Sequence, residues 1–275
     1  MTNHECQMGS PSEMSHWSLV IHSAFEMSHS SFFHPVTNEK CRGARNSLFK
    51  IPPHSGILPG VPKWVKFILA VGMLPVCAGA ARALWLVIQH SGSADTTWVP
   101  LLAGVACWLV IFLALPKPMW IYVLGHELTH ALWTWACGGQ VKKMKISSAG
   151  GHVVISKTNF VITLAPYVFP LYAVLVILVF AAGRLLWNWH LVYFHLTLGV
   201  AYAFHVTLTL YALRTKQSDI TSQGYLFSAV VIFLGNVSIL LLGIPLLAGR
   251  VSLLQSLTWW AKSTGLILQW LQKVI

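Results

Sequence analysis

The sequence predicts an all-α polytopic membrane protein with about six transmembrane helices and a small β-hairpin between the third and the fourth. Of its 275 residues, 56% are hydrophobic and 9% are charged, and one soluble domain could not bury that much apolar surface. Apolar runs of about 18 to 25 residues recur after residue 63, and each is long enough to cross roughly 30 Å of hydrocarbon as a helix. The runs are continuous, whereas the strands of a membrane barrel would alternate polar and apolar residues.

Six runs are expected to form the membrane-spanning helices, because a chain in lipid must satisfy its own backbone hydrogen bonds. Tryptophans stand at the ends of several runs, where aromatic side chains anchor helices at the interface. The expected spans are residues 65–88, 98–115, 119–137, 158–183, 186–213 and 225–247.

The chain is expected to divide into three parts. Residues 1–63 are polar and hold four of the seven acidic residues, which predicts a disordered N-terminal tail. Residues 64–247 are the expected membrane domain. In residues 248–275, polar side chains recur at largely helical spacing opposite Leu, Trp and Ile, which predicts an amphipathic helix lying in the membrane interface.

Charge and cysteine content argue against two other classes of protein. The formal net charge of +11 could suit nucleic acid, but the basic residues lie between apolar runs, so the lipid bilayer is the expected partner and nucleic acid is not. The five cysteines are scattered and form no C-x-x-C pair. We therefore expect neither a disulfide framework nor a thiolate metal site.

The third run contains the pattern His-Glu-x-x-His, formed by His126, Glu127 and His130. Residues four apart share one face of a helix, so both imidazoles can reach one tetrahedral zinc ion while Glu127 lies alongside as a general base. Ionisable groups within a membrane span are costly, and they are functional by default. The alternative is that the histidines pack between helices and that Glu127 is neutral or paired.

A catalytic zinc site needs a third protein ligand and leaves the fourth position to water. After residue 63, the only carboxylates besides Glu127 are those of Asp95 and Asp219. We expect Asp219 to be the third ligand, since it lies in the polar turn 217–224 before the sixth run; its alternative role is a helix cap. Asp95 looks like a capping residue in a loop. The other candidate ligands are Asp95, His152, His195 and His205.

Residues 141–156 follow the third run and place β-branched side chains on either side of the pair Gly150 and Gly151. This pattern predicts a hairpin or a bent pair of strands at the membrane surface. The expected hairpin begins only 11 residues after His130, the last residue of the His-Glu-x-x-His pattern.

Residues 126–151, which include the pattern, a Gly-x-x-Val and the β segment, resemble the active-site helix of the site-2 protease family. Members of that family are intramembrane zinc proteases that cleave transmembrane segments of their substrates. The resemblance implies that His126 and His130 bind zinc and that Glu127 is the base. It also implies that the hairpin around Gly150 and Gly151 guides an unwound substrate by strand addition.

Outside that stretch the resemblance is looser. Asn159, followed by Pro166 and Pro170, is similar to the family's next helix, in which an asparagine lies near the active site, so Asn159 is a candidate substrate-binding residue. The family's third ligand is the aspartate of a Leu-Asp-Gly sequence, which is absent here because Ile220 follows Asp219. The resemblance is specific over about 50 residues, from the third run into the fourth.

These observations predict an intramembrane zinc endopeptidase with one zinc ion, multi-pass in the cell membrane (plasma or inner), acting on membrane-protein substrates. One alternative is a transporter or channel, because Arg82 and His205 lie within expected spans and such residues also mark ion paths. A second is a zinc-binding scaffold without activity. Glu127 distinguishes them, since hydrolysis needs a base beside the metal and metal binding alone does not.

Overall fold

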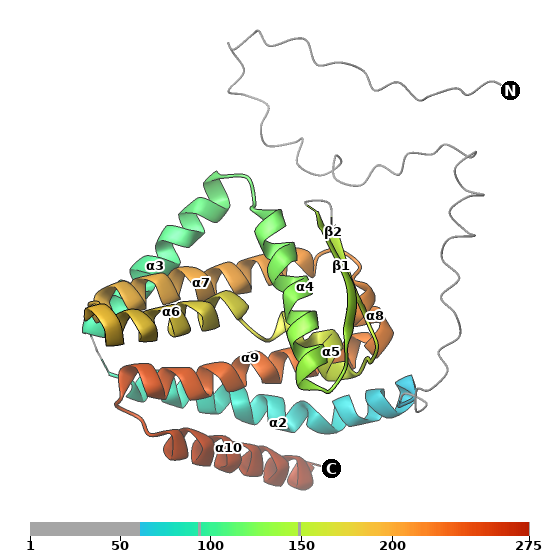
Figure 1. The fold of residues 1–275 in the computed structure, drawn as a ribbon. Coiled ribbons are helices and arrows are strands. Elements are labelled where there is room, and N and C mark those ends of the chain that lie inside the picture. The colour runs from blue at the N-terminus through green and yellow to red at the C-terminus, as the bar shows by residue number, and fades with distance from the viewer. Residues whose placement is uncertain (1–60, 93–94, 148–149, 275) are drawn as a thin grey trace, which may run out of the picture. The chain divides into compact units, whose positions relative to one another are not determined.

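The computed structural model describes residues 61–92, 95–147 and 150–274, so nearly all of the expected tail, residues 1–63, lies outside the described residues. The described chain is mostly helical and has one small sheet (Figure 1), as the sequence predicted. The elements are α2 (Lys63–His90), α3 (Asp95–Ala114), α4 (Met119–Ala136), β1 (Val141–Ser147), β2 (Gly150–Ile155), α5 (Phe160–Leu164), the 3-10 helix η2 (Ala165–Tyr167), α6 (Leu171–Trp187), α7 (Leu191–Ala212), α8 (Ser218–Gln223), α9 (Tyr225–Ala248) and α10 (Leu253–Val274).

Four helices are long and apolar enough to cross a membrane, namely α2, α3 from Thr96, α7 and α9. A fifth candidate is the broken pair Phe160–Tyr167 and Leu171–Trp187. The helix α4, which carries two histidines and a glutamate, is not among them. Six spans therefore remain a prediction.

The expected continuous span over residues 158–183 is broken in the structure. The chain bends by 74° between Phe160–Tyr167 and Leu171–Trp187. Pro166 lies in η2 and Pro170 is the N-cap of α6. Proline has no backbone N–H and its ring clashes with the preceding turn, which explains why the helix stops and restarts here. The break leaves α5 and η2 beside α4.

The helices α3 and α7 pack at very short range through two glycines. A Cβ atom added at Gly104 would collide with the carbonyl oxygen of Leu196, and one added at Gly199 would collide with that of Leu101. Small residues at membrane helix contacts allow backbones to approach in this way. The indole of Trp108 then donates to the Thr207 hydroxyl across the same interface, at 2.7 Å.

Alanine should therefore have opposite effects at two helical glycines. Gly199→Ala is expected to lower the free energy of unfolding by about 1–3 kcal/mol, because the α3 backbone must move. Gly243→Ala in α9 is the matched control: nothing lies within 4 Å of its added Cβ, so a gain of about 0.4–1 kcal/mol is expected. Thermal unfolding in detergent measures both. Equal effects of the two variants would contradict the packing described.

The C-terminal helix α10 runs beside α2 and contacts α9 as well (Figure 1). Ser256 donates to the Leu241 carbonyl at 2.8 Å, and the Trp260 indole donates to the Val76 carbonyl at 3.2 Å. Ser256 and Ser263, which the sequence pattern placed on the polar side, are buried. The interfacial position of this helix stays a prediction, and its small polar residues face other helices.

The sheet consists of β1 and β2, which pair antiparallel, and it lies beside α4 (Figure 1). Ser147 pairs with Gly150 and Ile146 with Gly151, so the glycine pair begins β2. The register of the two strands shifts between Val141 and Lys143. The contacts with α4 hold β2 next to the His-Glu-x-x-His residues.

Candidate metal centre

The helix α4 brings the two histidines of the His-Glu-x-x-His pattern together on one face. The ring centroids of His126 and His130 lie 4.9 Å apart, with the rings nearly perpendicular. Both Nε2 atoms point toward the same carboxylate, that of Asp219. The spacing of four residues along a helix is enough to place the two histidines on one face.

Asp219 reaches the two imidazoles from α8, about 90 residues further along the chain. Its Oδ2 atom lies 3.4 Å from the Nε2 of His126 and 3.4 Å from the Nε2 of His130. The short helix α8 ends at Gln223, and Gly224, which has φ +96°, joins it directly to α9. Glycine tolerates this positive φ, so the polar turn can fold back beside α4.

The electrostatic surroundings keep Asp219 ionised. Burial raises the pKa of its carboxyl, but the two facing histidines lower it by more, so its pKa lies well below the usual range. An ionised carboxylate facing two imidazole nitrogens is the charge arrangement that a divalent cation requires.

Neighbouring groups orient two of the three candidate ligands. The Nδ1 atom of His130 lies 2.9 Å from the carbonyl oxygen of Ile162, which fixes Nδ1 as the donor and leaves Nε2 free to bind a metal. The Tyr167 hydroxyl donates to Asp219 Oδ2 at 3.1 Å. Asn159 caps α5 by accepting a hydrogen bond from the Ile162 backbone N–H at 2.8 Å, so it supports the residue that orients His130.

A cavity of about 290 Å³ opens over these side chains. Glu127 lies on its wall beside the histidines, and residues of β2 form another part of the wall. A Cβ atom added at Gly151 would lie 2.7 Å from Glu127 Cγ, so only glycine lets the strand come this close. The lining residues are His126, Glu127, His130, Gly151, His152, Val153, Ile155, Thr158, Ile162, Thr163, Gln217, Ser218 and Asp219.

The structure separates the residues that the sequence singled out. His126, Glu127, His130, Asp219 and Gly151 line one cavity, together with the alternative ligand His152. Two expected substrate-binding residues, Gly150 and Asn159, are not among its lining residues. His195 instead lies beside the Thr96 carbonyl, and His205 is outside the ligand group. Asp95 is the first residue of α3, and its side chain is outside the described part of the structure.

Sequence reasoning missed Tyr167, which contacts two of the candidate ligands. Besides its bond to Asp219, its ring lies edge-on to that of His126, with the centroids 5.3 Å apart. Tyr167 follows Pro166 in an apolar stretch, and no local pattern distinguishes it from an ordinary core aromatic residue. Only the bend of the chain at this point brings it to the site.

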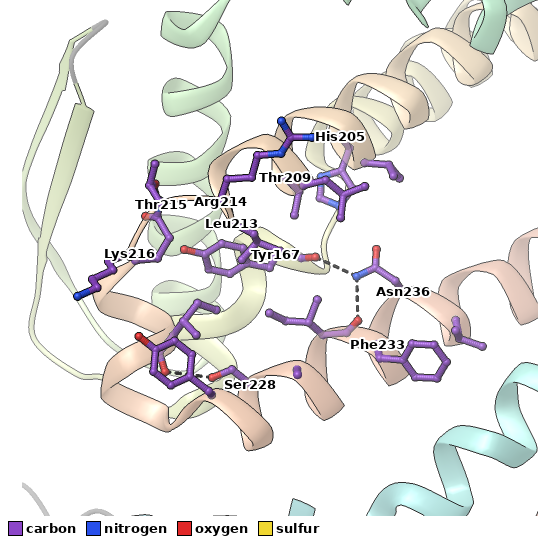
Figure 2. A pocket seen from close by; sticks show the side chains of 18 of the residues that line it. Tyr167, His205, Thr209, Leu213, Arg214, Thr215, Lys216, Ser228, Phe233 and Asn236 are labelled. Atoms are coloured by element: carbon purple, nitrogen blue, oxygen red, sulfur yellow. Dashed lines mark hydrogen bonds between the residues drawn. The ribbon is translucent and has the colours of Figure 1, made fainter. Parts of the chain in front are cut away.

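A larger cavity of about 890 Å³ adjoins the site between α7 and α9 (Figure 2). Its walls are mostly apolar, and it shares Gln217 with the smaller cavity. Tyr167 stands between the two, because it lines the larger cavity while its hydroxyl contacts Asp219. Asn236 secures this tyrosine by donating to its backbone carbonyl at 2.9 Å (Figure 2).

The residues present fit a metal ion. One ligand atom each from His126, His130 and Asp219 can be chosen so that all three lie within 4.8 Å of one another, and no other such group occurs among the residues whose side chains the structure describes. Two imidazoles and one carboxylate form a donor set that suits a divalent metal. The group can therefore hold a metal ion.

Comparison of the chain with protein-family models, with curated proteins and with solved structures found no match. What the site can do therefore follows from the chemistry of its side chains. That chemistry includes three candidate ligands and one further carboxylate in the same cavity.

Proposed function

We propose that this chain is an intramembrane zinc endopeptidase of the site-2 protease kind, which hydrolyses peptide bonds in membrane-spanning or membrane-proximal protein substrates. The observation that carries the proposal is the position of Glu127. It lies in the cavity formed by His126, His130 and Asp219, although it is not one of the three candidate ligands. A site for metal storage or scaffolding needs ligands, whereas hydrolysis also needs a base.

Zinc is the metal proposed, because two histidines and one carboxylate with an open fourth position form a typical catalytic zinc site. When bound, zinc makes a water molecule more acidic and stabilises a carbonyl oxygen that gains negative charge. The protein's part is to hold the ligands in place, through the Ile162 carbonyl behind His130 and the Tyr167 hydroxyl on Asp219.

Glu127 is assigned the proton transfers. Its carboxylate accepts a proton from the attacking water as the oxygen adds to the peptide carbonyl carbon. It then returns the proton to the nitrogen of the leaving amine as the C–N bond breaks. Glu127 and His130 are buried, and burial strengthens the electrostatic interactions that they make.

An extended peptide is the proposed form of the substrate. The strand β2 pairs with β1 on one side and contributes Gly151, Val153 and Ile155 to the cavity. A peptide that adds to β2 as a further strand would lie across Glu127. The adjoining apolar cavity offers space for the rest of a hydrophobic segment.

Filling the space at Gly151 tests this route. Gly151→Val is expected to lower peptide cleavage by about 10- to 100-fold, because its side chain would displace Glu127 or the substrate strand. Metal content should not change, since Gly151 is not a candidate ligand. Val154→Ala, on the same strand but outside the cavity lining, is the matched control and should cleave as the parent protein does. Normal cleavage by Gly151→Val would rule out this substrate position.

The decisive experiment combines metal analysis with an activity assay. Detergent-purified protein should contain close to one zinc ion and cut members of a panel of model transmembrane peptides. Removal of the metal with 1,10-phenanthroline should abolish cleavage, and added zinc should restore it. Zinc-loaded protein that cuts no peptide but carries ions into proteoliposomes would instead support the transporter alternative.

A further inference from the structure

Four buried polar atoms close to the candidate metal centre have no hydrogen-bond partner among the described residues. They are the Tyr122 hydroxyl, His126 Nδ1, His205 Nε2 and the Thr209 hydroxyl. Tyr122, His205 and Thr209 are only 8%, 7% and 5% exposed. Each unsatisfied buried group costs about 1–3 kcal/mol, and such groups are normally paired with protein or with ordered water.

Three of these residues meet at one small cavity. Tyr122, His126 and His205 all line a space of about 20 Å³, which is large enough for a single water molecule because one water needs roughly 10–15 Å³ by this measure. The other hydroxyls on its wall are already bonded: Thr129 donates to the Gly125 carbonyl and Tyr172 to that of Ile121. Among the side-chain polar atoms on its wall, those available to the cavity are therefore the unpaired ones.

The tautomer of His126 fits this arrangement. Its Nε2 faces Asp219 at 3.4 Å, so Nε2 is the atom that can bind a metal and Nδ1 carries the proton. Histidines that bind metals almost always donate their second N–H to a carbonyl, a carboxylate or water. His130 has the Ile162 carbonyl for this purpose, whereas no described protein atom accepts from His126 Nδ1.

We propose that one buried water molecule joins His126 to Tyr122 and His205, and that these two residues position His126 as a metal ligand. The water accepts a hydrogen bond from His126 Nδ1 and donates one to His205 Nε2 and one to the Tyr122 oxygen. The Tyr122 hydroxyl is then free to donate in turn to the Thr209 hydroxyl, the fourth unpaired atom. All four unpaired atoms gain a partner in this network, and the water makes the three bonds usual for a buried water.

This inference rests on the metal centre of the proposed function and adds a second helix to it. His205 and Thr209 belong to α7, so α7 would hold the orientation of a ligand on α4 without touching the metal. His205, which was an alternative ligand in the sequence analysis, thus receives a different role. His205 and Thr209 also line the larger cavity between α7 and α9 (Figure 2), which places the network between that cavity and the metal centre.

Metal affinity tests the inference independently of activity. Zinc binding by the purified full chain is measured by competition with a chromophoric chelator. Tyr122→Phe, which removes one oxygen atom, and His205→Leu are each expected to weaken binding by about 10- to 100-fold. Because both variants disrupt the same water, the double variant should bind no more weakly than about the worse single variant. His205→Gln, whose side-chain oxygen can accept from the water, should recover part of the affinity.

His195→Leu is the matched control. His195 lies on the same helix and is as buried as His205, but its Nδ1 lies beside the Thr96 carbonyl, away from the metal centre. It should lose stability in thermal unfolding and keep its zinc affinity. Parent-like affinity in both Tyr122→Phe and His205→Leu would overturn the inference while leaving the metal centre intact. Failure of the parent protein to bind zinc would overturn the metal centre, and the inference with it.

Discussion

Glu127→Gln is expected to keep close to one zinc ion per chain and to lose peptide cleavage by about 10²–10⁴-fold. Glutamine has the same size as glutamate and can occupy the same place on the cavity wall, but its amide cannot accept the proton of the attacking water. Glu127 is only 7% exposed, and Asp219 is the one other carboxylate that lines the cavity. Because Asp219 is a candidate ligand, no second carboxylate in the cavity is free to replace Glu127.

The control for this variant is Thr134→Val, on the same helix one turn beyond His130. Thr134 is fully buried and donates only to the His130 backbone carbonyl, so valine removes a hydroxyl without reaching the cavity. It should cleave peptides at the parent rate. If Glu127→Gln retained zinc and also retained cleavage, Glu127 would not be the base, and the assignment of proton transfers would be wrong.

The sequence predicted those site residues whose position follows from their spacing along one helix, or which belong to a residue type that is rare in the membrane part of the chain. His126, Glu127 and His130 share a helix, and a separation of four residues places two side chains on one face in any α-helix. Asp219 lies far away in sequence, but carboxylates are so few after residue 63 that little competes with it. Its place beside both imidazoles follows the expectation drawn from ligand chemistry.

The parts that escaped prediction depend on contacts between distant segments. Hydropathy alone joined residues 158–183 into one span, although Pro166 and Pro170 break the helix there. That break brings Tyr167 to Asp219, and no local sequence pattern around Tyr167 predicts this contact. Asn159, singled out by resemblance as a substrate-binding residue, is the cap of α5, and its substrate-binding role stays a prediction.

The types of secondary structure could also be predicted from local sequence patterns. Helices follow from continuous apolar runs and the sheet from β-branched residues around a glycine pair, and both kinds of element are present. How many helices cross the membrane depends also on how far polar side chains are shielded by neighbours. The helix α4 shows the difference: its ionisable side chains lower its hydropathy, yet Glu127 and His130 are buried against other elements.

Replacement of Asp219 should have the largest effect on metal binding. Asp219→Asn keeps the size of the side chain and an oxygen that can accept from Tyr167, but it removes the negative charge that faces both imidazoles. Two neutral histidines hold a divalent ion poorly in a weakly solvated site. The loss of zinc affinity should therefore exceed the roughly 10- to 100-fold expected when an outer partner is removed.

Tyr167→Phe provides the graded comparison, because it deletes the hydroxyl that donates to Asp219 and leaves the carboxylate in place. A loss of about 10- to 100-fold is expected for it, smaller than that of Asp219→Asn. Asp95→Asn is the matched control for charge, since it removes the other aspartate of the chain after residue 63. Chelator competition on the three purified variants should rank them with Asp219→Asn weakest, Tyr167→Phe next and Asp95→Asn like the parent protein. If Asp95→Asn lost zinc while Asp219→Asn kept it, the third ligand would be Asp95, and the contacts of Asp219 with His126 and His130 would belong to a site that binds no metal.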